Sequence, residues 1–300
     1  MIENFSVIFI SIVLEALPFV MLGAFLSSII QIYVSENFIA RILPKNKFVG
    51  LVAASLVGIV FPVCECAIIP IARRLIKKGV PINIAVTFML AVPIVNPVVL
   101  LSTYYAFHSK PYIVFLRGGL GLVIAITIGF IMGVLEERKN PIKMNYIDED
   151  NSCACGFDHN FKRPQSKFIQ ILQHANRELY DIGKLLILGA FISAVFQVII
   201  DRKYILLVGE HPIYSIAAMM LFAYTISLCS EADAFIASTF LGQFSIGGIV
   251  AFLVLGPMID IKNTLMLTSS FKSRFVAKLI FLIFTICFAA GYVINAVIGI

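Results

Sequence analysis

Apolar stretches long enough to cross a membrane recur along the whole of this 300-residue chain. We place eight of them, at about 5–34, 48–72, 80–107, 112–135, 182–206, 212–238, 244–269 and 274–298. With 60% hydrophobic and 13% charged residues, and a mean hydropathy of +0.98, the chain does not resemble a soluble domain. The sequence therefore predicts an all-α polytopic membrane protein with about eight transmembrane helices.

The first stretch is too long for a signal-peptide core and has neither a basic start nor a cleavage site, so we expect it to be retained as a helix. The net charge of +6 indicates contact with lipid headgroups rather than with nucleic acid. With an even number of spans both termini share one side of the membrane, together with Arg73, Arg74, Lys77, Lys78 and the 136–181 segment. Basic residues are only slightly in excess there, which favours termini inside.

A sequence repeat divides the chain. The residues LGAFLSSIIQ at Leu22–Gln31 return as LGAFISAVFQ at Leu188–Gln197, an offset of 166 positions. Nearly the same offset aligns Glu15 with Asp181, Cys64 with Cys229, Glu65–Cys66 with Ser230–Glu231, Pro93 with Pro257, and Asn96 with Asp260. We therefore predict two homologous four-span halves, residues 1–135 and 182–300, joined by a polar and amphipathic connecting loop at 136–181.

The relative direction of the two halves stays open in the sequence. Transporters are commonly built from such repeats, with the substrate site at the midplane between the halves. Four spans in each half make the repeats parallel. If Pro62–Pro70 is a re-entrant hairpin, the number of crossings changes and the repeats become inverted.

The segment FPVCECAIIPIARR at Phe61–Arg74 is costly for a membrane helix. A carboxylate near the bilayer centre costs about 2.5–3.5 kcal/mol on the insertion scale. A proline inside a helix removes one hydrogen bond. Polar residues recur in AVPIVNPVVL (91–100), CSEADAF (229–235) and LGPMIDIKNTLML (255–267). We expect helices broken at prolines, namely Pro62, Pro70, Pro93, Pro97 and Pro257.

Irregular backbone at membrane depth is tolerated where it lines a cavity. We therefore expect the polar residues of these segments to line one substrate path: Cys64, Glu65, Cys66, Asn96, Cys229, Glu231, Asp233 and Asp260. The sulfurs of Cys64 and Cys66 share a face only if the segment is extended, because residues two apart on a helix point about 200° apart. Cys287 is expected to be an apolar filler.

A structural alternative exists for the acids. They can pair with bases inside the bundle, with Arg117 or Lys278 neutralising Glu65 or Glu231. Proton coupling through one of the intramembrane carboxylates is a further hypothesis, and the sequence does not indicate which carboxylate.

The connecting loop contains CACGFDH, in which four side chains suit Zn(II) or Cu(I): Cys153, Cys155, Asp158 and His159. The alternative is a flexible linker whose thiols have no function. The stretch 168–180 that follows has apolar residues among polar ones. It fits either an amphipathic helix on the membrane surface or the solvated start of the fifth span.

The motifs FPVCECAIIPIARR, AVPIVNPVVL and LGPMIDIKNTLML resemble the bacterial permease family that includes organoarsenical (methylarsenite) exporters and permeases proposed to export copper or zinc. The resemblance covers the chain outside the 136–167 loop. It implies an eight-span, multi-pass permease in the bacterial inner membrane, and a second membrane-protein subunit as in Firmicute members. The exporters' thiol-rich motif maps onto Cys64 and Cys66.

We expect a secondary permease that moves a thiophilic metal ion or a trivalent arsenical outward, with no resident cofactor required. No GxxxxGK[ST] motif occurs, so an ion gradient or the substrate's own gradient has to drive it. The chain also has no HExxH motif and reads as a non-enzyme. The alternative is a membrane subunit of a two-component permease complex with a scaffold, redox or ion/pH-homeostasis role.

Overall fold

The computed structural model describes residues 2–33, 46–60, 65–136, 141–143, 167–199 and 212–298. Its helices are α1 (Ile2–Tyr33), α3 (Lys47–Val60), α4 (Glu65–Lys77), α5 (Ile82–Val95), α6 (Pro97–Ala106), α7 (Tyr112–Glu136), α8 (Lys167–Ile199), α10 (Pro212–Ile226), α11 (Asp233–Ser238), α12 (Ile246–Met258), α13 (Ile261–Ser270) and α14 (Ser273–Ile298).

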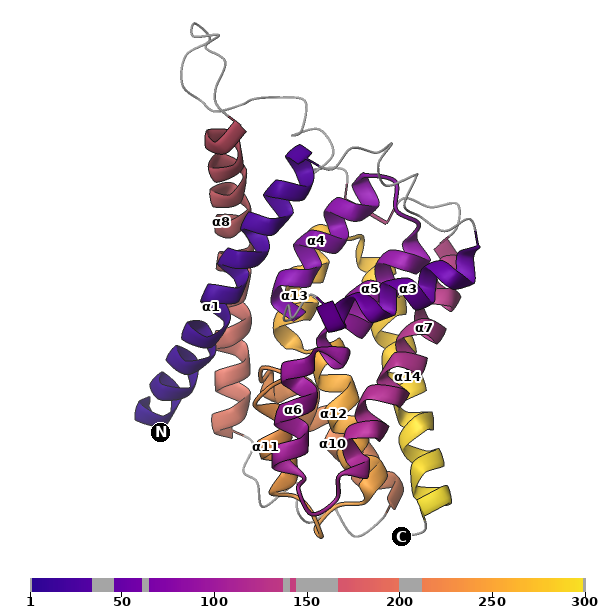
Figure 1. Ribbon diagram of the computed structural model, residues 1–300. Coiled ribbons are helices and arrows are strands. Elements are labelled where there is room, and N and C mark those ends of the chain that lie inside the picture. Colours follow the sequence, from indigo (N-terminus) through magenta and orange to yellow (C-terminus); the bar gives the residue numbers. More distant parts are fainter. Residues whose placement is uncertain are drawn as a thin grey trace, which may run out of the picture.

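The helices form an elongated bundle (Figure 1). Both termini lie at its lower end, whereas α4 and α7 end, and α8 begins, at its upper end. In the described part, five helical stretches are long and apolar enough to cross a membrane, and the bent pair α5 and α6 makes a sixth. The all-α polytopic membrane fold is therefore confirmed.

The count of eight spans is not confirmed. The predicted spans 48–72 and 212–238 are each divided between two shorter helices, α3 with α4 and α10 with α11. In Figure 1, α4 starts near mid-height and rises to the upper end, while α11 starts near mid-height and descends. Neither pair is one straight crossing.

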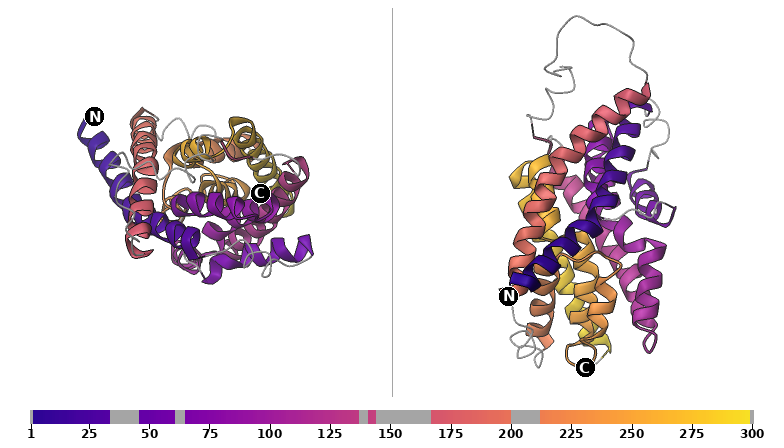
Figure 2. Two further views of the ribbon diagram at one scale, coloured as in Figure 1. Left: turned by 90° about the horizontal axis from the view of Figure 1, so that it is seen from above. Right: turned by 90° about the vertical axis from the view of Figure 1, so that its left-hand side faces the viewer.

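Helices α1 and α8, which carry the sequence repeat, pack against each other on one side of the bundle (Figure 2). They run in opposite directions: α1 rises and α8 descends. Phe5 near the start of α1 contacts Phe191 late in α8, with ring centroids 5.3 Å apart. Helix α8 is continuous from Lys167, so the 168–180 stretch is the start of the fifth span and not a separate surface helix.

A glycine shared by the two repeat segments brings each helix close to the centre. A Cβ atom added at Gly23 of α1 would lie 2.5 Å from the Cβ of Ala67 in α4. At Gly189 of α8 it would lie 2.9 Å from the Cα of Lys262 in α13. Both distances are shorter than packed carbon atoms tolerate, so glycine permits α1 to approach α4 and α8 to approach α13.

Two spans are broken near mid-height, and each break is capped by a side chain. Helices α5 and α6 meet at 41°, where the Asn96 side chain accepts a hydrogen bond from the Val98 amide at 3.0 Å. Helices α12 and α13 are separated by extended residues Ile259 and Asp260. Asp260 accepts from the Asn263 amide at 2.6 Å. These caps satisfy amides that a helix start leaves unpaired.

Of the four described prolines that were predicted to break helices, one lies at a break. Pro70, Pro93 and Pro257 lie inside α4, α5 and α12, and Pro97 is the first residue of α6. The prediction that helices break at the prolines is therefore wrong for Pro70, Pro93 and Pro257 themselves. Pro62 lies outside the described residues.

Candidate functional site

Helix α4 begins at mid-height with two buried polar residues. Glu65 is 5% exposed and Cys66 is 2% exposed. A carboxylate in the first turn is favourable because the free amides of a helix start carry partial positive charge. Cys66 Sγ lies 4.0 Å from the side-chain oxygen of Asn263 in α13. The start of α4 therefore faces the start of α13.

One pocket joins these residues to the other half of the chain. It is small, with room for about one water molecule. Its lining residues are Ile12, Glu15, Ala16, Phe19, Glu65, Cys66, Cys229 and Lys262. The apolar residues come from α1, whereas Cys229 belongs to the turn between α10 and α11. Two thiols from distant parts of the sequence thus line the same pocket with carboxylates and an ammonium group.

A buried arginine connects the pocket to the α10–α11 turn. Arg117 of α7 donates through Nη2 to the Asp233 carboxylate at 2.8 Å and to the Ser230 carbonyl at 3.0 Å. Through Nη1 it donates to Thr103 of α6 at 2.7 Å. The Ser230 hydroxyl donates to Glu65 at 3.3 Å. Glu65, Ser230, Arg117 and Asp233 therefore form one continuous polar chain.

The second buried base lies at the start of α13. Lys262 Nζ is 3.5 Å from Asp260 Oδ2, and both side chains are at most 3% exposed. The other carboxylate oxygen of Asp260 caps α13. Asp260 therefore acts both as a helix cap and as the counter-ion of Lys262.

The turn before α11 is conformationally unusual. Ser227 has a φ of +48°, in the left-handed region that side chains other than glycine rarely adopt. Its side chain is 1% exposed. Such outliers concentrate where function fixes the backbone. The conformation places Cys229 and Ser230 immediately after the end of α10.

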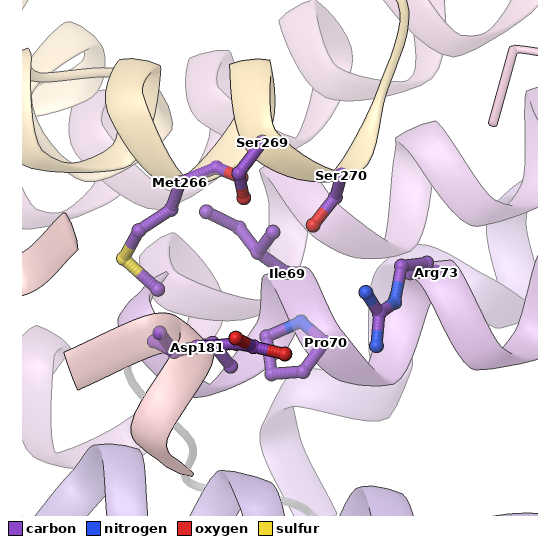
Figure 3. Close-up of a pocket in the computed structure, with 8 residues that line it drawn as sticks. Ile69, Pro70, Arg73, Asp181, Met266, Ser269 and Ser270 are labelled. Atoms are coloured by element: carbon purple, nitrogen blue, oxygen red, sulfur yellow. The ribbon is translucent and has the colours of Figure 1, made fainter. Parts of the chain in front are cut away.

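A second pocket lies between α4, α8 and α13 (Figure 3). It too has room for about one water molecule. Its lining residues are Ile69, Pro70, Arg73, Asp181, Ile182, Met266, Ser269 and Ser270. Cys66 and Ile69 are three residues apart on α4, and Lys262 and Met266 are four apart on α13, so each pair shares a helix face. In Figure 3 the Asp181 carboxylate and the Arg73 guanidinium both point into this space.

Several predicted path residues meet in this site. Glu65, Cys66 and Cys229 line the first pocket, and Asp233 and Asp260 join it through Arg117, Ser230 and Lys262. Asn96 is buried but serves as a cap, and Glu231 is half-buried and does not line the pocket. Cys64 and the loop residues Cys153, Cys155, Asp158 and His159 lie outside the described residues.

The predicted charge pairs differ from those in the structure. Arg117 binds Asp233 rather than Glu65 or Glu231. Lys278 binds Glu136 near the upper end. Sequence reasoning left Glu15 and Lys262 out of the path, although each is a charged residue within an apolar stretch. Within the described ranges, no group of three or more His, Cys, Asp or Glu residues is arranged to hold a metal ion.

Comparison with known proteins gives three useful matches. The ArsP_1 family model, described as predicted permease, matches residues 1–296. The UPF0718 protein YcgR of Bacillus subtilis is 46% identical over 288 residues, 96% of each chain. A protein of Streptococcus mutans named "Putative two-component membrane permease complex subunit" is 39% identical over 274 residues, which cover 91% of this chain and 89% of that one. No solved structure matches.

Proposed function

Because the chain belongs to the predicted permease family, we propose that this multi-pass membrane protein is a secondary permease that exports a thiophilic substrate, either a soft metal ion or a trivalent arsenical. One observation carries the proposal: Cys66 and Cys229, from separate parts of the chain, line one pocket with Glu65. Thiolate sulfur is the side-chain ligand that such substrates prefer.

The pocket suits a transient substrate. Transport requires binding that is strong enough to admit the substrate and weak enough to release it. Two thiols and a carboxylate provide fewer soft ligands than the three or four of a permanent metal site. The pocket in Figure 3 is lined by residues about one turn further along α4 and α13, and we infer that a substrate leaving the first pocket would pass along these two helices.

We also infer that the two halves are inverted repeats. Helices α1 and α8 run in opposite directions, and so do α5–α6 and α12–α13 (Figure 1). The aligned residues Asn96 and Asp260 both cap the second helix of a broken span. Inverted repeats give alternating access when one unit rocks against another around a midplane site.

Accumulation of copper, zinc and methylarsenite in bacteria that carry the intact protein tests the function. For at least one of these substrates, cells that carry the wild-type protein should accumulate less than cells that carry an empty vector. Cys66→Ser and Cys229→Ser should each reduce export by about tenfold or more, since even the loss of an outer-sphere partner has an effect of that size on metal sites.

Cys287→Ser is the matched control, because Cys287 is buried as deeply but lines an apolar pocket between α7, α12 and α14. It should leave export unchanged. Equal loss of export in all three variants would contradict a role for the thiol pair. So would unchanged export of every substrate in variants that are made and inserted normally.

The name of the Streptococcus mutans relative supports a second candidate, a subunit that acts with another membrane protein. Under this reading the chain expressed alone exports nothing and acquires activity only with the partner. Substrate accumulation is measured once in cells that express this chain alone and once in cells of the native host. Export in both supports a permease that acts alone, and export in the native host only supports the two-subunit complex.

A further inference from the structure

Helix α1 has a charged side chain on the surface of the molecule near the middle of its membrane span. Glu15 is exposed and lies near the midpoint of the apolar stretch Phe5–Ile30. Ser11, Pro18 and Leu22 lie on the same side of the helix and are also exposed. We call these four residues the Glu15 face. An exposed carboxyl group at this depth is costly in lipid, and such groups normally face protein or water.

The sequence repeat provides an internal comparison for Glu15. Asp181 of α8 aligns with it and is paired with Lys184 of the same helix at 2.9 Å. The residue three positions after Glu15 is Pro18, which has no charge to offer. In the described part of the chain, Glu15 forms no ion pair and no hydrogen bond through its side chain. The second half thus neutralises its acid, whereas the first half presents its acid on the surface.

The Glu15 face adjoins the first pocket. Glu15 lines this pocket together with Cys66 and Lys262, which are at most 3% exposed. Because one lining residue is itself exposed, the pocket reaches the surface of the bundle beside α1. Glu231 of the α10–α11 turn is half-buried and near enough to Glu15 for their charges to interact. Helix α1 packs mainly against α8 and α4 within the described ranges, so this edge of the bundle has room for another helix (Figure 2).

Resting on the second candidate function, in which the chain acts with another membrane protein, we propose that the Glu15 face binds a transmembrane helix of a different protein, and that this helix carries a lysine or arginine near its midpoint. The base neutralises Glu15 and lies within reach of Glu231. The helix that carries it separates the first pocket from lipid. Paired charges between helices are the usual way in which a membrane accommodates ionisable side chains.

A second copy of this chain fits the Glu15 face less well. The buried bases Arg117 and Lys262 are each paired with an acid of their own chain, and so is the exposed Lys184. A contact between these bases and Glu15 of another copy would require an existing pair to break. A protein with a different sequence is therefore the better partner.

Photocrosslinking in the native host tests this surface. The full chain carries p-benzoylphenylalanine in place of Ser11 or Leu22 of the Glu15 face. Irradiation should join it to a second membrane protein, and mass spectrometry of the joined peptide should show a transmembrane segment with a lysine or arginine near its midpoint. Phe281 is the control position, because it is 70% exposed on α14, at the other side of the bundle. The same substitution there should give no such product.

Reversal of the charge tests the ion pair itself. Glu15→Lys should lower the cross-linked fraction by about tenfold or more, because like charges that face each other across an interface repel. A glutamate in place of the partner's identified base should restore cross-linking in the Glu15→Lys background, which also shows that the variant is folded. Glu3→Lys makes the same charge change at an exposed position near the start of α1 and should leave the cross-linked fraction unchanged.

Several outcomes overturn the proposal: products with lipid only, products with a second copy of this chain only, or a partner segment without a base. So do an unchanged cross-linked fraction in Glu15→Lys and a charge swap that restores nothing. Export of copper, zinc and methylarsenite is measured in the same cells. Export without a cross-link at the Glu15 face overturns this interface and leaves the permease function standing. A cross-link without export of any substrate supports the interface and contradicts the export function, and absence of both overturns both.

Discussion

Arg117 is fully buried and makes three hydrogen bonds, to Thr103, the Ser230 carbonyl and Asp233. Its planar guanidinium can serve all three at once, which a lysine ammonium in the same place would not do with the same geometry. The arginine thereby holds the turn before α11 against α6 and α7. The position of Cys229 in the pocket depends on this contact.

Replacement of Arg117 should therefore destabilise the protein strongly. Arg117→Gln leaves Asp233 buried without its partner, and breaking a buried pair in this way costs about 3–5 kcal/mol. The double variant Arg117→Leu/Asp233→Leu should cost less than the sum of the single variants, because no uncompensated charge remains. Chemical unfolding in mixed micelles measures both effects.

The pair of Lys184 with Asp181 is the matched comparison. The Lys184 side chain is 54% exposed, so Lys184→Ala should cost no more than about 1 kcal/mol. Equal losses for Arg117→Gln and Lys184→Ala would mean that burial does not set the strength of the Arg117 contact.

At this scale the sequence indicates which residue types matter but not how they pair. Intramembrane acids and thiols are conspicuous because each is costly in lipid. Arg117, the partner of Asp233, is 116 positions away in the chain. From the sequence alone, Asp233 and Glu65 are equally plausible partners for Arg117. Three-dimensional packing decides between them.

At the scale of helices, both breaks within spans have a capping residue, and one of them is also followed directly by a proline, Pro97. Proline removes one hydrogen bond but the helix can continue past it, as α5 and α12 do. The break comes three residues later, where Asn96 or Asp260 offers the next helix a side-chain acceptor. The sequence predicts breaks in the spans that contain Pro93 and Pro257 but not the break between α10 and α11, where no proline occurs. A search for cap residues after Pro93 and Pro257 would have placed the first two breaks.

The glycines of the repeat segment lead to a prediction about helix packing. Gly189→Ala should destabilise the protein by about 1–3 kcal/mol, since the new methyl group meets the backbone of α13 at Lys262. In the same helix, Gly183 has nothing within 4 Å of an added Cβ. Gly183→Ala should be neutral or stabilising by up to about 1 kcal/mol, because alanine favours helix.

Thermal unfolding of the purified variants in detergent compares the two substitutions. Gly23→Ala, which brings a methyl group against Ala67, should resemble Gly189→Ala if the two repeat segments have the same packing role. A Gly183→Ala variant as unstable as Gly189→Ala would show that loss of glycine flexibility, and not contact with α13, is responsible.

For the whole molecule, the number of crossings changes which segments share a side of the membrane. Eight spans place both termini with Arg73, Arg74, Lys77 and Lys78. In Figure 1 the end of α4, which contains Arg73, Arg74 and Lys77, lies at the end of the molecule opposite to the termini. That part of the sequence-based topology is wrong. Hydropathy detects apolar length but not direction, so two helices that turn back at mid-height look like one span.

Among the described residues, the basic side chains are unequally divided between the two ends of the molecule. The upper end of the molecule holds the end of α4, with Arg73, Arg74 and Lys77, and the junction of α13 and α14, with Lys272 and Arg274. The described turn between α6 and α7 at the lower end has Lys110, and Arg202 and Lys203 lie outside the described residues. Short loops rich in lysine and arginine remain in the cytoplasm. We therefore expect the upper end to face the cytoplasm and both termini to face outward, contrary to the orientation that the sequence favours.

Paired reporter fusions to the full chain check this orientation. Alkaline phosphatase is active only outside the cytoplasm, and a green fluorescent protein exported in unfolded form stays dark. At the C-terminus we expect an active phosphatase and a dark fluorescent protein, and inserted at the turn after Lys78 the reverse. Reporters inserted next to Lys110 should give the same result as those at the C-terminus, an active phosphatase and a dark fluorescent protein. Eight straight spans require instead that Lys78 and the C-terminus give the same result and Lys110 the opposite one, so the three positions together distinguish six crossings from eight.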